Sequence, residues 1–241
     1  MRLENSVALI TGASKGLGLE IARLYAERGA RLAIAARHPG PLERAAEELR
    51  QKTEVVSLAI DVSQEAERLV EAVLERFGRI DVLVNNASEL GPSPMPELES
   101  LGWQDMERIL RVNVTAPLHL TQLVLPQMRA RGSGVVINVT SDAGVEAYAG
   151  WGGYGASKAA LEHMSRVLAE ELAGSGIRVY VVDPGDMNTE MHRLAEPGVD
   201  LSGLPGPEVA APAFVRLVEE EQAAFGRFQA QAMASAIAVA R

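Results

Sequence analysis

Short apolar runs that alternate with helix-like stretches constrain the fold of this chain more than any other feature. The runs are nearly continuous in Val, Ile, Leu and Ala, which is typical of parallel strands that are buried on both faces. They occupy 6–11, 31–37, 54–61, 81–87, 134–141 and 177–185. Amphipathic stretches that predict helices lie at 16–29, 41–52, 64–77, 103–129 and 154–173. This alternation predicts a doubly wound α/β fold with right-handed crossovers.

No linker or internal repeat divides the chain, so residues 1–241 are predicted to form one domain. The length of 241 residues and the hydrophobic content of 47% are sufficient for one sizeable core. The least regular stretch is 184–213, in which Gly and Pro recur. Such a segment is usually a functional lid or disordered, and we favour a substrate lid. The Ala-rich stretch at 232–240 is expected to pack as a terminal segment.

Composition narrows the classes of function. The net charge of −9 argues against a general binder of nucleic acid or of anionic membranes. The chain has no cysteine, which excludes disulfides and thiol catalysis. No apolar run approaches the ~20 residues that span a bilayer, and the first strand comes too early for a signal peptide. The four histidines lack the spacing of metal ligands. We expect a cytoplasmic protein without a catalytic metal.

A glycine-rich turn, "TGASKGLG", follows the first strand and opens the first helix. Glycine permits a sharp turn and a close approach of the backbone to a pyrophosphate, and the helix N-terminus supplies free N–H groups. The alternative is an ordinary turn between strand and helix. The position of the turn favours a dinucleotide site that includes Gly12, Ser14, Lys15, Gly16, Leu17 and Gly18.

Tyr154 and Lys158 stand four positions apart in a predicted helix, so they share one face about one turn apart. The chain has only three lysines, which makes this pair improbable by chance. The phenol has an ordinary pKa near 10, and a neighbouring ammonium is expected to lower it toward neutrality. Tyr154 is therefore a candidate general acid or base. The alternative is a solvated pair on a helix surface.

Taken in order, TGxxxGLG, "NNA" at 85–87, a serine, YxxxK and a late PG resemble the short-chain dehydrogenase/reductase family over residues 6 to about 191. The resemblance implies a Rossmann-type sheet of about seven strands, a nicotinamide cofactor and hydride transfer to or from a carbonyl or alcohol. It implies that Ser141 binds the substrate oxygen and that Lys158 also binds the nicotinamide ribose. Thr140 is a competing hydroxyl, but alternation along the strand would point it the other way.

The same resemblance implies further roles. Asn113 would hold a water in a proton relay through Lys158, or it is a satisfied core amide. Asp61 would contact the adenine, or it is a carboxylate at a helix N-terminus. Other cofactor contacts are implied at Asn85, Ala87, Tyr154, Pro184, Gly185 and Thr189. The chain departs from the family at Ser88, where glycine is usual, and at Asp183, where asparagine is usual.

The end of the second strand bears on the choice of cofactor. NAD-selective sites place an acid there to bind the ribose 2′-OH. Here Ala36 and Arg37 end the strand, and no acid follows before Glu43. Arg37 can pair with a 2′-phosphate, and Lys15 matches the second basic position of the family. NADP(H) is therefore predicted over NAD(H), with two solvated charges as the alternative.

The sequence predicts an NADP(H)-dependent oxidoreductase that uses Tyr154 as general acid/base on a small carbonyl or secondary alcohol substrate. Two alternatives stay open: a dehydratase or epimerase that uses the same cofactor, and a non-catalytic NADP-binding sensor. The resemblance also implies a homodimer or homotetramer formed by the helices at 103–129 and 154–173. The tail lacks the usual late glycine pair of the family, so the tetramer stays open.

Overall fold

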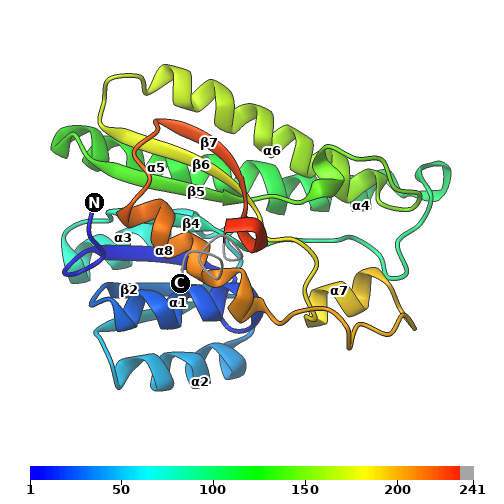
Figure 1. Cartoon of the computed structure of the whole chain (residues 1–241), viewed down its shortest axis with the longest axis horizontal. Helices are drawn as coiled ribbons and strands as arrows, with labels where there is room; N and C mark the ends of the chain where they lie inside the picture. Colours follow the sequence, from blue (N-terminus) through cyan, green and yellow to red (C-terminus); the bar gives the residue numbers. More distant parts are fainter. Residues whose placement is uncertain (234–241) are drawn as a thin grey trace.

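The structure is a computed structural model that describes residues 1–233. Seven parallel strands form one sheet in the order β3-β2-β1-β4-β5-β6-β7 (Figure 1). The doubly wound Rossmann-type sheet and the single domain are confirmed. Most of the terminal segment expected at 232–240 lies outside the described residues. The strands are β1 Val7–Thr11, β2 Arg31–Ala36, β3 Val55–Ala59, β4 Val82–Asn85, β5 Gly134–Val139, β6 Ile177–Asp183 and β7 Phe225–Gln229.

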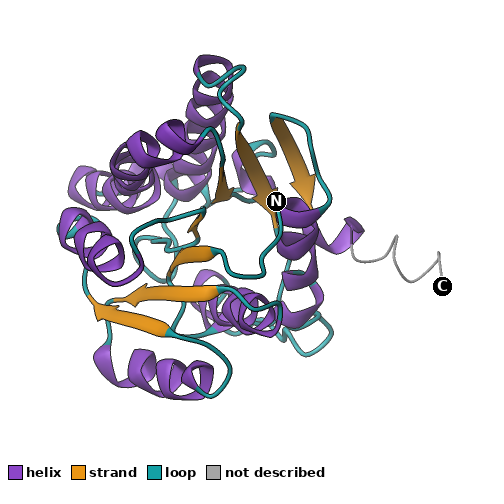
Figure 2. Cartoon of the chain, turned by 90° about the vertical axis from the view of Figure 1, so that its left-hand side faces the viewer, coloured by secondary structure: helices purple, strands orange, loops and turns teal. Residues whose placement is uncertain are grey.

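Helices connect the strands and cover both faces of the sheet (Figure 2). One face packs against α1, α2 and α8, where buried Ile21, Tyr25 and Phe214 meet the strands. The other packs against α3, α5 and α6 through residues such as Leu69, Val124 and Leu172. The helices are α1 Gly16–Glu27, α2 Pro39–Arg50, α3 Ala66–Phe77, α4 Trp103–Leu110, α5 Ala116–Arg131, α6 Gly152–Glu171, α7 Glu190–Ala195 and α8 Ala211–Glu219.

The long helix predicted at 103–129 is interrupted. A π-helical turn at Arg111–Thr115 separates α4 from α5. Pro117 explains the interruption, because it has no N–H to donate to the carbonyl of Asn113 and its ring crowds that carbonyl. The turn adds one residue to the helical path and carries Asn113 into the interior, where it is 1% exposed.

The strand order reverses next to β1, since the chain runs outward through β2 and β3 and then returns to β4. In sheets of this type, ligands bind at such a reversal, outside the carboxyl ends of the strands. The stretch 184–213 crosses this edge and contains α7, with α8 starting at its far end. No helix within residues 1–233 is long and apolar enough to cross a membrane.

Candidate active site

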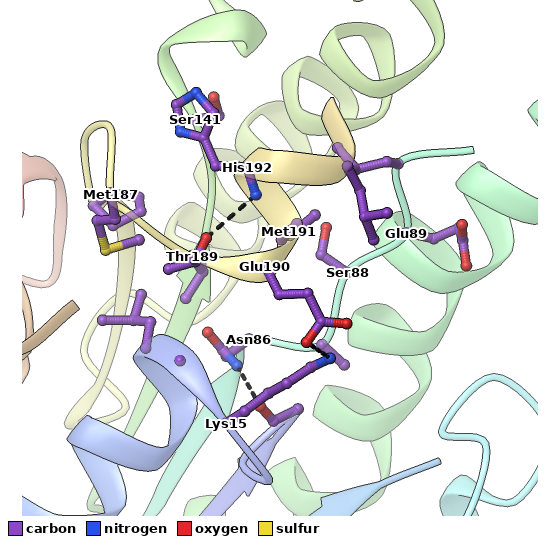
Figure 3. Close-up of a pocket in the computed structure, with 18 of the residues that line it drawn as sticks. Lys15, Asn86, Ser88, Glu89, Ser141, Met187, Thr189, Glu190, Met191 and His192 are labelled. Atoms are coloured by element: carbon purple, nitrogen blue, oxygen red, sulfur yellow. Dashed lines mark hydrogen bonds and ion pairs between the residues drawn. The ribbon is translucent and has the colours of Figure 1, made fainter. Parts of the chain in front are cut away.

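A cavity of about 610 Å³ opens at the carboxyl edge of the sheet (Figure 3). The segments that follow strands β1 to β6 form its wall, together with α6 and the 184–194 part of the lid segment. The cavity brings together most of the site residues predicted from the sequence: Gly12, Ser14, Lys15, Gly16, Leu17, Arg37, Asp61, Ala87, Ser141, Tyr154, Lys158, Pro184, Gly185 and Thr189.

The glycine turn has the geometry of a dinucleotide cradle. Gly12 and Gly16 have φ of +67° and +56°, a region that favours glycine. A Cβ at Gly18 would lie 2.5 Å from Asn86 Nδ2 and 2.6 Å from the carbonyl oxygen of Gly12. No side chain caps the first turn of α1, so its N–H groups stay available to a pyrophosphate. The residues present therefore fit a nicotinamide dinucleotide.

Asn86 stabilises this turn from β4. Its Nδ2 donates to the carbonyl oxygens of Thr11 and Gly12 at 2.9 and 3.2 Å. The Thr11 hydroxyl in turn accepts from the backbone N–H groups of Asn86 and Ala87, both at 3.0 Å. The role of Asn86 was missed in the sequence, although it lies within the "NNA" motif and so carried a signal.

Tyr154 and Lys158 lie on one face of α6, and both are buried, at 8% and 2% exposure. Lys158 Nζ lies 5.3 Å from the centroid of the Tyr154 ring and donates to the carbonyl oxygen of Val139 at 2.9 Å. Burial lowers the pKa of Lys158 to about 7. Burial also raises the pKa of Tyr154, a hydrogen bond with Ser88 opposes the shift, and the carboxylates of Asp183 and Asp142 add to it.

The direction of the Tyr154 shift differs from the lowering expected from the sequence. The physical reason is that both groups leave water together. Desolvation penalises the phenolate and the ammonium alike, so it outweighs their mutual attraction. Lys158 is then only partly protonated at neutral pH, and Tyr154 retains its phenolic proton.

Ser141 lies two residues after the end of β5 and lines the same cavity. Its hydroxyl donates to Asp142 Oδ1 at 2.9 Å and accepts from the N–H of Ala143 at 3.2 Å. The other carboxylate oxygen of Asp142 accepts from the Tyr148 hydroxyl at 2.9 Å. Thr140, the competing hydroxyl, donates to buried Glu162 at 2.9 Å. Of these two residues, Ser141 is the more accessible from the cavity, because it is half-buried whereas Thr140 is 1% exposed.

Three predicted residues are not brought into the cavity wall. Asn113 is held by the backbone of Glu89, with its Nδ2 donating to the Glu89 carbonyl and its Oδ1 accepting from the Glu89 N–H at 2.8 and 2.7 Å. It also bonds Ser88 and Ser157, so its side-chain amide is satisfied, and its role in a proton relay stays a prediction. Asn85 is buried in the sheet and donates to Asn138 at 2.8 Å. Gly18 likewise acts through close packing rather than by lining the cavity.

Asp61 and Thr189 line the cavity while also ordering their own loops. Asp61 Oδ1 accepts from the N–H and hydroxyl of Ser63, as expected of a carboxylate just before a helix. Burial opposes ionisation of Asp61, but its hydrogen bonds lower its pKa overall. Thr189 caps α7 by accepting from the N–H of His192 at 3.3 Å. Its methyl group lies 3.9 Å from the position of a Cβ at Gly16.

Both cations predicted to bind a 2′-phosphate have carboxylate partners. Lys15 Nζ lies 2.7 Å from Glu190 Oε2 of α7 (Figure 3). Arg37 Nη1 lies 3.3 Å from Glu89 Oε2. An acid therefore does lie near the end of the second strand in the folded chain, so the prediction that none lies there is wrong. Glu89 is distant in sequence and arrives from the segment after β4, so a pattern local to the second strand could not reveal it.

A buried charge network behind Ser141 was also missed. Glu162 on α6 is 2% exposed and accepts from Arg227 Nε of β7 at 3.0 and 3.1 Å. Arg227 Nη2 also lies 3.7 Å from Asp183, whose Oδ1 accepts from the N–H of Gly185. Burial raises the pKa of Asp183, the residue that departs from the family pattern, and Arg227 opposes that shift. Within residues 1–233 no cluster of potential metal ligands occurs.

The chain is similar to known proteins over most of its length. Residues 6–199 match the family model for short chain dehydrogenases. The chain is 36% identical over 194 residues to a 3-oxoacyl-(acyl-carrier-protein) reductase of Thermotoga maritima, covering 79% of this chain and 78% of that protein.

Solved structures extend the similarity to almost the whole chain. A short chain dehydrogenase from Pseudomonas syringae superposes with a TM-score of 0.88 at 30% identity, covering 95% of this chain and 96% of that one. One from Shigella flexneri, solved in complex with NADP, gives a TM-score of 0.85 at 29% identity over 95% and 99% of the two chains. The chain therefore belongs to the short chain dehydrogenase family of oxidoreductases.

Proposed function

We propose that this protein is an NADP(H)-dependent oxidoreductase that interconverts a carbonyl and a secondary alcohol, with Tyr154 as the general acid/base. The observation that carries the proposal is the meeting of Tyr154, Lys158 and Ser141 with the glycine turn in one cavity. A bound nicotinamide supplies or accepts the hydride. The residues that would hold it are the glycine turn, Lys158, Thr189 and the loop at 184–185.

Tyr154 would transfer the proton. In the reducing direction its phenol donates to the carbonyl oxygen of the substrate, and the raised pKa keeps that proton in place at neutral pH. Ser141 would hydrogen-bond the same oxygen and fix its position. Lys158, with a pKa lowered to about 7, can supply or take up a proton beside the phenol. In the oxidising direction the same groups would act in reverse.

The substrate side of the cavity is mixed in character. Trp151 packs edge-on against Tyr154, with ring centroids 5.9 Å apart. Leu90, Met187 and Met191 add apolar surface, and His192 adds a polar group. This lining suits an apolar ketone. We propose that the lid segment 184–213 covers it, since Ser93 donates to the carbonyl of Leu194 at 2.7 Å and so joins α7 to the loop after β4.

A panel of ketones, sugars, steroids and acyl-thioester ketones, assayed with NADPH, tests the proposal. Substrate-dependent consumption of NADPH is expected, whereas a dehydratase, an epimerase or a sensor would consume none. Tyr154→Phe should reduce turnover by at least about a hundredfold, the usual range for loss of a general acid, and leave NADPH binding within a few-fold. Retention of most activity by the phenylalanine variant would remove Tyr154 from this role.

We also propose a homodimer at minimum. The supporting observation is that α5 and α6 carry exposed apolar side chains, among them Leu118 and Val167 at 39% and 44% exposure. An isologous contact between such helices would cover these residues in both subunits. Light scattering at micromolar concentration should give at least twice the chain mass, and a monomeric mass would contradict the assembly.

A further inference from the structure

Glu89 is a largely buried carboxylate at the cofactor end of the cavity, where the sequence predicted none. Its side chain, labelled in Figure 3, is 14% exposed. Both Glu89 and Arg37 line the cavity. Two backbone hydrogen bonds to Asn113 fix the residue, and its Oε1 accepts from the N–H of Gly91 at 3.2 Å. These hydrogen bonds therefore hold the carboxylate in one position.

The important partner of Glu89 is Arg37. The guanidinium lies 3.3 Å from Glu89 Oε2, and a second cation, Arg108, lies 4.0 Å from Oε1. Arg37 is also the residue proposed to bind a 2′-phosphate. A phosphate that pairs with Arg37 must displace this carboxylate or share the guanidinium with it, and the two anions repel each other at that separation.

The other cation of the predicted phosphate site provides a contrast. The Lys15–Glu190 pair is more than half exposed on both sides, at 57% and 58%. Water and salt screen such a pair, and its contribution is small. Arg37 is about as exposed as Lys15, at 55%, but Glu89 is only 14% exposed, so its carboxylate is screened less than that of Glu190. Of these two acids, it should therefore compete more strongly with an anionic ligand.

We propose that Glu89 is a specificity-determining residue for the cofactor: its carboxylate competes with the 2′-phosphate for Arg37 and narrows the preference for NADPH over NADH. NADH has no phosphate at this position, so its binding does not depend on this competition. The inference rests on the proposed function, because it assumes that the glycine turn and Arg37 hold a nicotinamide dinucleotide.

Direct binding measures the effect without a substrate. The dissociation constants of NADPH and NADH are measured by nucleotide fluorescence and calorimetry for the wild type and Glu89→Gln. The glutamine keeps an acceptor for the Gly91 N–H but carries no charge. The ratio Kd(NADH)/Kd(NADPH) should rise about fivefold or more, which corresponds to about 1 kcal/mol. Glu89→Ala should change the ratio in the same direction.

Two controls separate this effect from general electrostatics. Glu75→Gln removes the same charge from an exposed position near the C-terminal end of α3, at the opposite edge of the sheet, and should leave the ratio unchanged. In an Arg37→Gln background, Glu89→Gln should change the ratio less than twofold, since the competition requires the guanidinium. Thermal melts confirm that each variant is folded.

The outcomes are distinguishable. An unchanged or lower ratio in folded Glu89→Gln, with nucleotide binding intact, removes the role of Glu89 and leaves the proposed function standing. An equal increase of the Kd ratio in Glu75→Gln also overturns the inference. So does a change of the ratio by Glu89→Gln that is as large in the Arg37→Gln background as in the wild type. A wild type that binds neither nucleotide removes both proposals.

Discussion

Lys158 Nζ lies 5.3 Å from the centre of the Tyr154 ring and donates to the carbonyl oxygen of Val139, so the two side chains are held together at the end of β5. Burial acts on them in opposite directions, raising the pKa of Tyr154 and lowering that of Lys158 to about 7. The pair therefore favours its neutral forms: a protonated phenol beside a readily deprotonated amine. This relationship has consequences for both stability and catalysis.

Burial of Lys158 should make stability depend on pH. Its pKa falls from 10.5 in the unfolded chain to about 7 in the fold, so between these values the unfolded chain binds more protons. Stability should rise with pH across this window, by at most about 1.4 kcal/mol per pH unit from this group. Urea unfolding of the wild type and Lys158→Met from pH 7 to 10 measures it. The variant should show the smaller slope, and equal slopes would mean that Lys158 titrates normally.

Ser88 should lower the pKa of Tyr154. Its hydroxyl proton is directed at Asn113 Oδ1 at 3.2 Å, and the hydroxyl can rotate to donate that proton to the Tyr154 phenolate, which opposes the raised pKa of the phenol. Ser88→Ala removes that bond, so the pKa of Tyr154 should rise further. Alcohol oxidation needs the phenolate, so its pH profile should move to higher pH, while reduction at pH 7 changes little. Profiles of kcat/KM for both directions test this, and a shift to lower pH would contradict it.

Arg227 should contribute to the stability of the folded protein. It donates to Glu162, which is 2% exposed, so Arg227→Met would leave a buried carboxylate with only its bonds from Thr140 and Arg166. Breaking a buried pair in this way costs about 3–5 kcal/mol. Arg68→Met, which breaks an exposed pair with Glu65, should cost under ~1 kcal/mol. Urea unfolding measures the loss in unfolding free energy for both variants. Similar losses would contradict a stabilising role of the Arg227–Glu162 pair beyond that of an exposed pair.

Arg37 should distinguish NADPH from NADH. Arg37→Asp removes a charge-assisted pair of roughly 1.5–3 kcal/mol and places a second acid beside Glu89. NADPH binding should weaken at least about tenfold more than NADH binding. Arg129→Asp, near the C-terminal end of α5 at the opposite edge of the sheet, makes the same charge change and should leave the ratio unaffected. A wild type that prefers NADH, or an equal loss for both nucleotides, would contradict the assignment of Arg37.

The amino-acid sequence by itself determined those features that depend on neighbours along the chain. Five of the six apolar runs form strands whose side chains are buried on both faces of the sheet, and the sixth forms β3, an edge strand that is only partly buried. The glycine turn is encoded by residues whose backbone angles or close contacts exclude side chains, as at Gly12 and Gly18. Tyr154 and Lys158 meet because four residues make about one helical turn.

Only the tertiary structure decided the features that join distant parts of the chain. β7 lies at the sheet edge and lacks a continuous apolar run, since Gly226, Arg227 and Gln229 interrupt it. β7 therefore forms by pairing with β6, and no local sequence pattern predicts it. The Arg37–Glu89 and Arg227–Glu162 pairs span 52 and 65 positions. The strengths of these contacts and the pKa values around Tyr154 depend on burial, and burial exists only once the sheet and its helices have packed.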